Sequence, residues 1–483
     1  MDVIDKSVTL TKDVTDDVWQ KLKELVVSLE DIKLTVKDVN VVLKVLDIPE
    51  AISVVTLENC TFKSYTELSG LQNGRYLGIT NCSKNGLFSG LKLVDVVCRT
   101  FEFYEDKPKN KNIAHEKYLS LDIKNSVFHN LFYSSVDAPV FNKVVFIEKL
   151  VYSSHARHEE EQFFFNNCFF ADFLNIEVNN VNRLSINMNK CQLISTQKDI
   201  VNSVSFSVNN VVISSLNITE SNLDGMNFNL FRREIEKIDI VNSQIKRLEL
   251  YSVDDVDAPN RIYSISILDS HVDELLLNNR HIVHSLFFNR SKFNKPPQMF
   301  GANMPHGSYF PNKESFISRK GESDASCYRT LRYFMEIERN RELEGMFFTL
   351  EQESLLNKND GIKKYLSINC LYYFFSNYGT DYIRPLLILV LSVILFTFTY
   401  SLMLSPKISP SLPIDWDIIE NSFIFTIKQV LQPFSSLKDM TPLLDKNEPL
   451  EIKFVFIGVI NSMLSITCLA LSGLAVRWKF KRG

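Results

Sequence analysis

Two long apolar runs dominate the hydrophobic pattern of this 483-residue chain, and both lie near its C-terminus. They extend from Pro385 to Leu404 and from Phe454 to Val476, 20 and 23 residues without Asp, Glu, Lys or Arg. A helix rises about 1.5 Å per residue, so each run can cross a hydrocarbon core of about 30 Å. Buried helices of soluble domains seldom reach this length without a charge. The pattern predicts a membrane-anchoring helical hairpin behind about 380 residues of soluble character.

Basic residues predict the orientation of this hairpin. The chain ends in Arg477-Trp478-Lys479-Phe480-Lys481-Arg482, and Lys363, Lys364 and Arg384 precede the first run. The 49 residues between the runs carry five Lys against seven acidic residues. Lys and Arg gather on the cytoplasmic side of membrane proteins, so we expect a two-pass protein with both termini in the cytoplasm. No secretory signal is predicted in Met1 to Glu30, which has no short apolar core.

A short block recurs through the first 300 residues, with the form apolar, any, Asn or Asp, Cys or Ser, any, apolar. The clearest copies are Leu57–Phe62, Ile123–Phe128, Phe165–Phe170, Ile240–Ile245 and Ile267–Val272, with weaker ones around Cys82, Cys191, Ser221 and Ser291. The Cys or Ser position advances by 22 residues from Cys60 to Cys82, and by 42 from Ser126 to Cys168. A period near 21 residues with a doubled step predicts a solenoid with one degenerate coil.

Apolar residues also recur at every fifth position inside these repeats. The three series are Val208, Ile213, Ile218, Leu223 and Phe228; Ile240, Ile245 and Leu250; and Ile267, Val272 and Leu277. Four faces of five residues would make about one coil per period, so the region resembles a degenerate pentapeptide-repeat right-handed β-helix. A leucine-rich repeat is the alternative, since Ile235, Ile238, Ile240, Ser243 and Ile245 match that consensus. The β-helix is favoured because few helix-period segments separate the blocks.

Residues that interrupt secondary structure (Pro and Gly) and residues that cap helices predict the domain boundaries. Residues 1–48 should form a helical cap, in which Thr15-Asp16-Asp17 precedes an amphipathic helix with Val18, Leu22, Leu25, Val26 and Leu29. The β-solenoid should cover 49–293, and the Pro- and Gly-rich stretch 294–322 should be a linker. A helical stalk is expected over 323–383, N-capped by Ser323-Asp324, with Arg332 paired to Glu336. The membrane module is expected over 384–483.

The stalk carries a family resemblance. Tyr328-Arg329-Thr330-Leu331, Glu338 to Glu344, Phe347-Phe348 and Glu351 are similar to the helical segment of bacterial pentapeptide-repeat proteins that end in two membrane spans. In many of those proteins the spans flank a pore segment like that of two-transmembrane potassium channels. The resemblance implies a location in the inner (cytoplasmic) membrane of a bacterium. It also implies a homo-oligomer, most simply a tetramer, because two spans cannot surround a pore alone.

The segment between the spans departs from the channel pattern. A potassium filter displays backbone carbonyls from a run such as Thr-Val-Gly-Tyr-Gly, but residues 423–436 contain no Gly and include Lys428. Segment 418–436 is too short to span, so it is either re-entrant or interfacial on its Phe423, Ile427 and Val430 face, and the interfacial interpretation is favoured. Candidate pore or interface residues are Thr426, Lys428, Gln429, Gln432, Ser435, Gly458, Ser462, Ser465 and Gly473. Small groups on the second run, Ser472 among them, more often serve close helix packing than a lumen.

The remaining composition narrows the function. A net charge of −4 argues against broad nucleic-acid binding, and eight Cys without a CxxC pair suit buried thiols in a reducing compartment. His155 to Glu161 is best explained as a solvated loop, and His281 and His284 have no acidic neighbour in the sequence, so neither metal nor cofactor is expected. No catalytic motif is present.

We therefore expect a membrane-anchored non-enzyme whose partners are the lipid bilayer, copies of itself and an unidentified protein. Its repeat domain should sense or recruit that protein, and its two-span module should be channel-like or membrane-perturbing. The alternative is a non-conducting, membrane-tethered scaffold whose hairpin is only an anchor.

Overall fold

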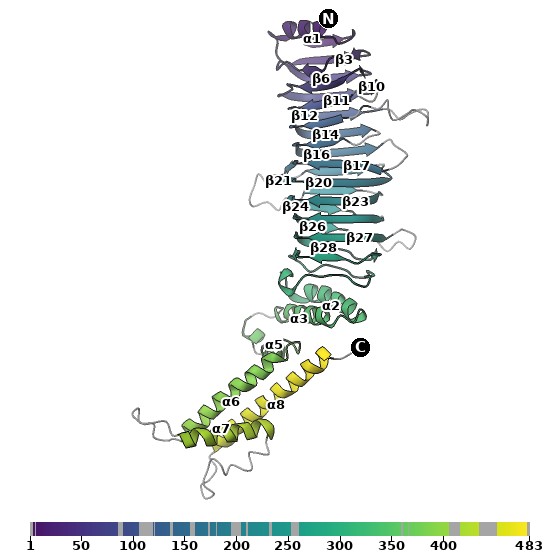
Figure 1. Cartoon of the computed structure of the whole chain (residues 1–483). Helices are drawn as coiled ribbons and strands as arrows, with labels where there is room; N and C mark the ends of the chain where they lie inside the picture. Colours follow the sequence, from purple (N-terminus) through teal and green to yellow (C-terminus); the bar gives the residue numbers. More distant parts are fainter. Residues whose placement is uncertain are drawn as a thin grey trace. The chain divides into compact units, whose positions relative to one another are not determined.

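The computed structural model contains two compact units, Met1–Ser318 and Arg319–Gly483 (Figure 1). The residues that it describes are 3–4, 6–85, 90–105, 119, 121–135, 139–154, 160–171, 174–179, 181–194, 204–208, 211–230, 234–252, 260–358, 361–365, 367–404, 416–433 and 452–480.

The first unit is a parallel β-solenoid of about ten turns, as the repeat pattern predicts. One long sheet has 16 strands: β1 (Val3–Ile4), β2 (Ser7–Leu10), β3 (Ile32–Lys37), β6 (Ile52–Glu58), β9 (Gly74–Thr80), β12 (Val97–Tyr104), β14 (Val127–Ser135), β16 (Val145–Ser154), β18 (Phe169–Ala171), β19 (Asn175–Asn179), β21 (Gln192–Ile194), β22 (Val204–Val208), β24 (Asn222–Asn229), β26 (Gln244–Glu249), β28 (His271–Leu276) and β31 (Lys292–Phe293). Apart from the antiparallel β1–β2 pair, the described strands pair in parallel.

A second long sheet has 12 strands and alternates with the first along the chain. Its strands are β5 (Val45–Asp47), β8 (Tyr65–Ser69), β11 (Gly90–Val94), β13 (Leu121–Lys124), β15 (Val140–Asn142), β17 (Glu160–Asn166), β20 (Arg183–Asn189), β23 (Val212–Thr219), β25 (Ile235–Val241), β27 (Arg261–Leu268), β29 (His281–Ile282) and β30 (Phe287–Asn289). A three-stranded sheet of β4 (Asn40–Val41), β7 (Thr61–Phe62) and β10 (Ser83–Lys84) belongs to the N-terminal coils.

The five-residue spacing of apolar positions is confirmed as a burial pattern. Every member of the three predicted series lies in the core, and Ile240 pairs with Ile267 across adjacent coils. A second buried series lies two residues earlier, at Leu216, Ser221, Met226, Ile238, Ser243, Leu248, Ile265, Ser270 and Leu275. Inward side chains are two residues apart along a straight strand and three apart across a corner. A spacing of two residues along the strand and one of three across the corner add up to the five-residue period. Each face of a coil therefore has the same local backbone geometry.

The recurring form of the block follows from the backbone geometry at the corner between two faces of a coil. Its Asn or Asp adopts a left-handed backbone, with φ of 48° at Asn125 and 49° at Asp269, a conformation that Asn and Asp tolerate better than most residues. The next residue is buried. Ser270 Oγ donates to the Leu268 carbonyl at 2.6 Å and accepts from the Ser243 N–H at 3.1 Å. The small polar residue therefore connects neighbouring coils where backbone groups would otherwise be unpaired.

The copies of the block do not all lie on the same corner, contrary to the simple repeat alignment. Asn59 and Asn81 follow β6 and β9 of the 16-stranded sheet, whereas Asn125 and the later copies follow strands of the 12-stranded sheet. Because the faces share one geometry, the block fits either corner. The 42-residue step from Ser126 to Cys168 contains one further corner of the same kind. At this corner Lys143 has the left-handed backbone, and the fully buried Val144 takes the position of the Cys or Ser.

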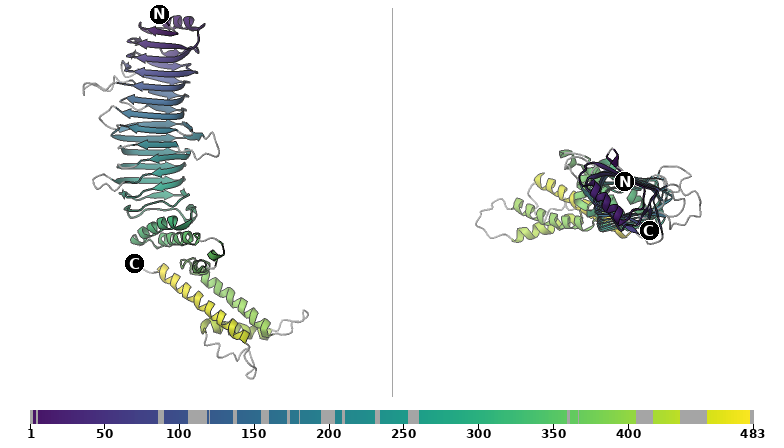
Figure 2. Two further views of the ribbon diagram at one scale, coloured as in Figure 1. Left: turned by 180° about the vertical axis from the view of Figure 1, so that it is seen from behind. Right: turned by 90° about the horizontal axis from the view of Figure 1, so that it is seen from above.

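Both predicted solenoid boundaries are wrong by part of a coil. Helix α1 (Asp16–Val26) begins after Thr15 as predicted and lies across the N-terminal end of the stack (Figure 2). Strands β2 to β5, however, already belong to the solenoid, so 1–48 is more than a cap.

At the C-terminal end of the solenoid the predicted linker forms a last irregular coil, in which Phe316 bridges to Phe293 and Met299 is fully buried. This coil pairs with the preceding one through single-residue bridges, because its prolines lack the backbone N–H groups that a longer strand needs. Between the two bridge partners lies the short 3-10 helix η2 (Lys313–Ser315).

The second unit is helical. Its helices are α2 (Gly321–Ile337), α3 (Arg341–Leu356), α4 (Ile362–Tyr365), α5 (Ile368–Ser376), α6 (Ile383–Leu404), α7 (Trp416–Leu431) and α8 (Ile452–Phe480). Helices α2 and α3 pack as a hairpin, which confirms the predicted stalk helices. Asp324 lies in the first turn of α2 and accepts from the Lys320 N–H at 2.8 Å, so Ser323-Asp324 is not the N-cap.

The predicted Arg332–Glu336 pair is also replaced. Arg332 Nη1 lies 2.9 Å from Glu351 Oε2 on α3, and Arg329 Nε donates to Glu351 Oε1 at 2.8 Å. The Glu351 side chain is only 4% exposed. A buried carboxylate offers a stronger partner than a solvated one a turn away, so the two arginines join the helices of the hairpin.

Candidate functional site: the polar interior of helices α6, α7 and α8

Helices α6 and α8 are the two membrane-length elements of the described chain. By length and composition each could cross a membrane: Ile383–Leu404 has a mean hydropathy of 2.4, and Ile452–Arg477 has 2.2. They lie side by side, and Ser472 Oγ on α8 donates to the Tyr382 carbonyl, just before α6, at 3.4 Å (Figure 1). The start of α6 and the end of α8 are therefore adjacent, as in a hairpin.

The polarity of the three helices is reversed relative to a soluble bundle. Large apolar side chains point outward, with Leu391 on α6 65% exposed, Leu431 on α7 74% and Phe456 on α8 67%. Polar side chains point inward, at Ser392, Thr397, Tyr400, Ser422, Thr426, Gln429, Asn461, Ser462, Ser465 and Ser472. A helix in water shows the opposite arrangement. An apolar exterior around a polar interior is expected when hydrocarbon surrounds the helices.

Helix α7 packs against both long helices through a polar stripe. Ser422, Phe425, Thr426 and Gln429 are fully buried, at the i, i+3, i+4 and i+7 spacing of one helix face. The predicted interfacial face lies opposite, with Phe423 45% exposed. The long helices therefore cover the polar face of α7, and its apolar Phe423 face is left on the outside.

One residue from each helix meets at the centre of this interior. Tyr400 Oη donates to Gln429 Oε1 at 2.9 Å, and Asn461 Nδ2 donates to the same oxygen at 2.6 Å. All three side chains are fully buried. Phe425 packs edge-on against the Tyr400 ring, with centroids 5.2 Å apart, and Phe454 stacks on it at 6.3 Å. The aromatic rings close the interior around the three hydrogen-bonding groups.

Several polar atoms of this interior lack a hydrogen-bond partner among the described residues. They are Thr397 Oγ1, Ser422 Oγ, Gln429 Nε2, Asn461 Oδ1 and Ser465 Oγ. Each such buried group costs about 1–3 kcal/mol. The interior thus offers neutral donors and acceptors that could hydrogen-bond to a polar solute or a hydrated ion. It holds no Asp, Glu, Lys, Arg or His side chain among the described residues.

The structure brings together only some of the predicted site residues. Gly458, Ser462 and Ser465 are buried with Thr426 and Gln429, whereas Lys428, Gln432 and Gly473 are exposed. Ser435 and the His155 to His158 stretch lie outside the described residues. Gly458 and Ser462 are covered by the chain's own helices.

Sequence reasoning missed Tyr400 and Asn461. Asn461 is the single side-chain amide in the second apolar run, and Tyr400 is the single tyrosine in the first. A polar residue in a membrane-length run commonly marks a functional or packing site. The sequence therefore contains a signal for Tyr400 and Asn461, but it does not indicate which residue each of them contacts.

Comparison of the chain with models of known protein families, with curated proteins and with solved structures finds no match. The fold and the polar interior are therefore interpreted from their own geometry. Among the described residues, no three His, Cys, Asp or Glu side chains gather as metal ligands. His281 Nδ1 contacts the side-chain amide of Asn303 at 3.0 Å.

Proposed function

We propose that this chain is a two-pass membrane protein whose solenoid recruits or senses a protein partner, and whose helices α6 to α8 form a channel-like module. The observation that carries the proposal is the reversed polarity of the module, with the shorter, 16-residue α7 contributing Gln429 between two membrane-length helices. The basic residues Arg384 and Arg477 to Arg482 support cytoplasmic termini, and hence a cytoplasmic solenoid. The inner membrane of a bacterium is the location that the family resemblance supports.

A span, a short helix and a second span in this order resemble the arrangement of two-transmembrane channels. Two spans and one short helix cannot surround a pore alone, so conduction requires a homo-oligomer, with a tetramer as the simplest case. Potassium selectivity is not part of the proposal, because residues 423–436 contain no Gly. The long, regular surface of a solenoid suits binding of a partner along several coils.

A non-conducting scaffold is the second candidate, and a specific observation favours it. Phe396, Tyr400, Phe425 and Phe454 form an aromatic cluster around the hydrogen-bonded centre, as in a module packed only for stability. In that case α6 and α8 anchor the solenoid, and the amide contacts serve to join the helices.

Ion flux through liposomes containing the purified full chain separates these candidates. We expect flux from an oligomer, and we expect Gln429→Leu to change it about tenfold, because the central oxygen that Tyr400 and Asn461 share is removed. Gln432→Leu is the matched control, since Gln432 is exposed, and it should change the flux less than about twofold. Lys428→Glu should leave ion preference unchanged, because Lys428 is exposed on the outer side of α7. Ion-tight liposomes and a strictly monomeric protein by light scattering would favour the scaffold.

A further inference from the structure

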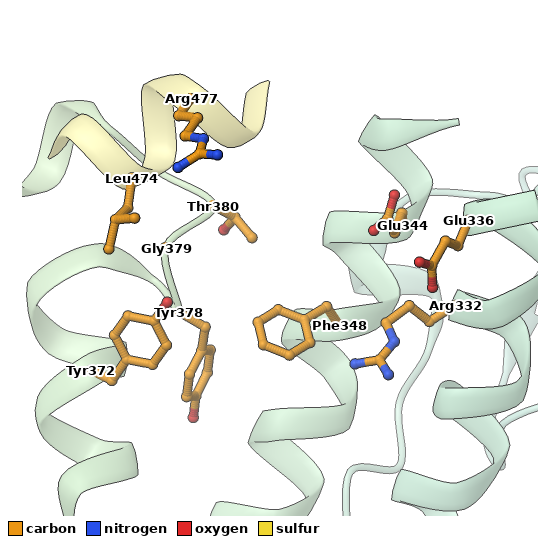
Figure 3. A pocket seen from close by; sticks show the side chains of 10 residues that line it. All are labelled: Arg332, Glu336, Glu344, Phe348, Tyr372, Tyr378, Gly379, Thr380, Leu474 and Arg477. Carbon is orange, nitrogen blue, oxygen red and sulfur yellow. The ribbon is translucent and has the colours of Figure 1, made fainter. Parts of the chain in front are cut away.

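A pocket of about 470 Å³ lies within the helical unit, between the α2–α3 hairpin, the end of α5 with the turn that follows it, and the last turns of α8. Its walls include Glu336 of α2, Glu344 and Phe348 of α3, Tyr372 and Tyr378 at the end of α5, and Arg477 of α8 (Figure 3). The volume is in the range of pockets that hold small organic ligands. No part of it overlaps the polar interior described above.

The position of the pocket along the helices places it at the level of lipid headgroups. Arg477 is the first charged residue after the apolar run that ends at Val476, and Leu474, inside that run, also lines the pocket. Thr380 lines it from the turn just before α6. If α6 and α8 cross a bilayer, the pocket lies where the hydrocarbon core ends, which is the depth of the lipid headgroups.

The charges of the pocket are of both signs, and Arg332 lies on the same α2–α3 side as the two carboxylates. Arg332 is already paired with Glu351 and stacks on the Phe348 ring at 5.4 Å, and Glu344 lies 2.6 Å from Arg341. Arg477 and Glu336 form no ion pair among the described residues. Figure 3 shows Arg477 on the α8 side and both carboxylates on the α2–α3 side. A headgroup with several negative charges would face Glu336 unfavourably, whereas a zwitterion matches Arg477 on one side and Glu336 on the other.

Aromatic rings line the space between these charges. Tyr372 and Tyr378 pack edge to face with centroids 5.8 Å apart, and aromatic faces attract alkylammonium groups. The turn that holds Tyr378 has three consecutive left-handed residues, Asn377, Tyr378 and Gly379. Gly379 has a φ of 77°, a backbone conformation that favours glycine, and a Cβ there would lie 2.5 Å from Tyr372 Oη. The turn therefore fixes the aromatic wall of the pocket.

We propose that this pocket binds the headgroup of a zwitterionic phospholipid with a primary ammonium, of the phosphoethanolamine type. The phosphate lies against Arg477, and the ammonium lies against Glu336, Glu344 and the aromatic rings. A primary ammonium is favoured over a quaternary one because its N–H groups donate charge-assisted hydrogen bonds to carboxylates. The proposal rests on the membrane insertion of α6 and α8 proposed above, and it does not depend on conduction.

Native mass spectrometry of the full-length protein with equimolar phosphatidylethanolamine, phosphatidylcholine and phosphatidylglycerol tests the proposal. We expect phosphatidylethanolamine to be retained preferentially, and Glu336→Gln or Arg477→Gln to lower its occupancy about tenfold, since each removes one charge contact. The matched controls are Glu342→Gln, exposed on α3 outside the pocket, and Arg384→Gln, at the same membrane level and paired with Asp381. Each control should change occupancy less than about twofold. Glu336→Lys should shift the preference to phosphatidylglycerol.

Three results would overturn the proposal. Equal or better retention of phosphatidylglycerol by the unmodified protein would mean that the carboxylates do not select the ligand. Equal retention of phosphatidylcholine would show that ammonium hydrogen bonds are not used. Displacement of the lipid by equimolar free glycerophosphoethanolamine would identify a soluble zwitterion as the occupant. Protein that stays in solution without detergent would instead refute the membrane insertion itself, so the two failures are distinguishable.

Discussion

Ile240→Asp should unfold its coil of the solenoid, at a cost of at least about 4 kcal/mol, the largest effect expected of any substitution proposed for this protein. Ile240 is fully buried in β25 and pairs with Ile218 and Ile267 on the adjacent coils. A carboxylate there would have no cation to pair with and would face only apolar neighbours. Thermal unfolding of the full chain, followed by circular dichroism, should show a lower midpoint or loss of the β-sheet signal.

Lys246→Asp is the matched control for this prediction. Lys246 is half-buried on β26, with its side chain on the outer side of a corner. The substitution should cost less than about 1 kcal/mol, most of it from repulsion by Asp273 nearby. Equal loss of folding at both positions would show that the inward register of the coils is incorrect.

Glu351→Ala should loosen the α2–α3 hairpin by about 2–3 kcal/mol. The side chain is 4% exposed and accepts from or lies against two guanidinium groups, those of Arg329 and Arg332. Both arginines keep access to water, with 49% and 29% of their side chains exposed, so the cost falls below the 3–5 kcal/mol of a fully buried pair. Amide hydrogen exchange of α2 and α3 should accelerate correspondingly.

Glu342→Ala tests whether that effect is specific to the buried carboxylate. Glu342 lies on the same helix but is exposed, and its removal should change exchange by no more than about 0.5 kcal/mol. If the two variants exchange alike, the Arg329–Glu351–Arg332 contacts do not hold the hairpin.

The solenoid could be predicted from sequence because its geometry is local. Each five-residue face has two inward side chains and one corner. This places Ile240, Ile245 and Leu250 at a fixed spacing that does not depend on the sequence of the neighbouring coil. The corner on which a block lies could not be predicted, because Asn59 and Asn125 have the same local geometry in different ladders. The last coil was mistaken for a linker because isolated bridges such as Phe316 to Phe293 leave no alternating pattern.

The candidate site was predictable only in part, for a related reason. Thr426 and Gln429 stand out as polar residues in an apolar segment, and this local signal identified them. Their partners depend on how α6, α7 and α8 pack, and no local period encodes that Gln429 meets Tyr400 and Asn461. What covers the polar face of α7 could not be predicted for the same reason. Its apolar Phe423 face suggested an interfacial helix, whereas packing against the two long helices uses the Ser422, Thr426 and Gln429 face.

Cysteine labelling in sealed cells tests the membrane placement of both units most directly. Single cysteines are introduced at Lys292 on the solenoid and at Ile424 on α7, both exposed, in a Cys370→Ser background, because Cys370 is the one cysteine not fully buried. A membrane-impermeant maleimide should label Lys292→Cys only after the membrane is opened. It should leave Ile424→Cys unlabelled in both states, because lipid covers that face of α7. Labelling of Lys292→Cys in sealed cells, or ready labelling of Ile424→Cys, would contradict a cytoplasmic solenoid joined to a lipid-embedded three-helix module.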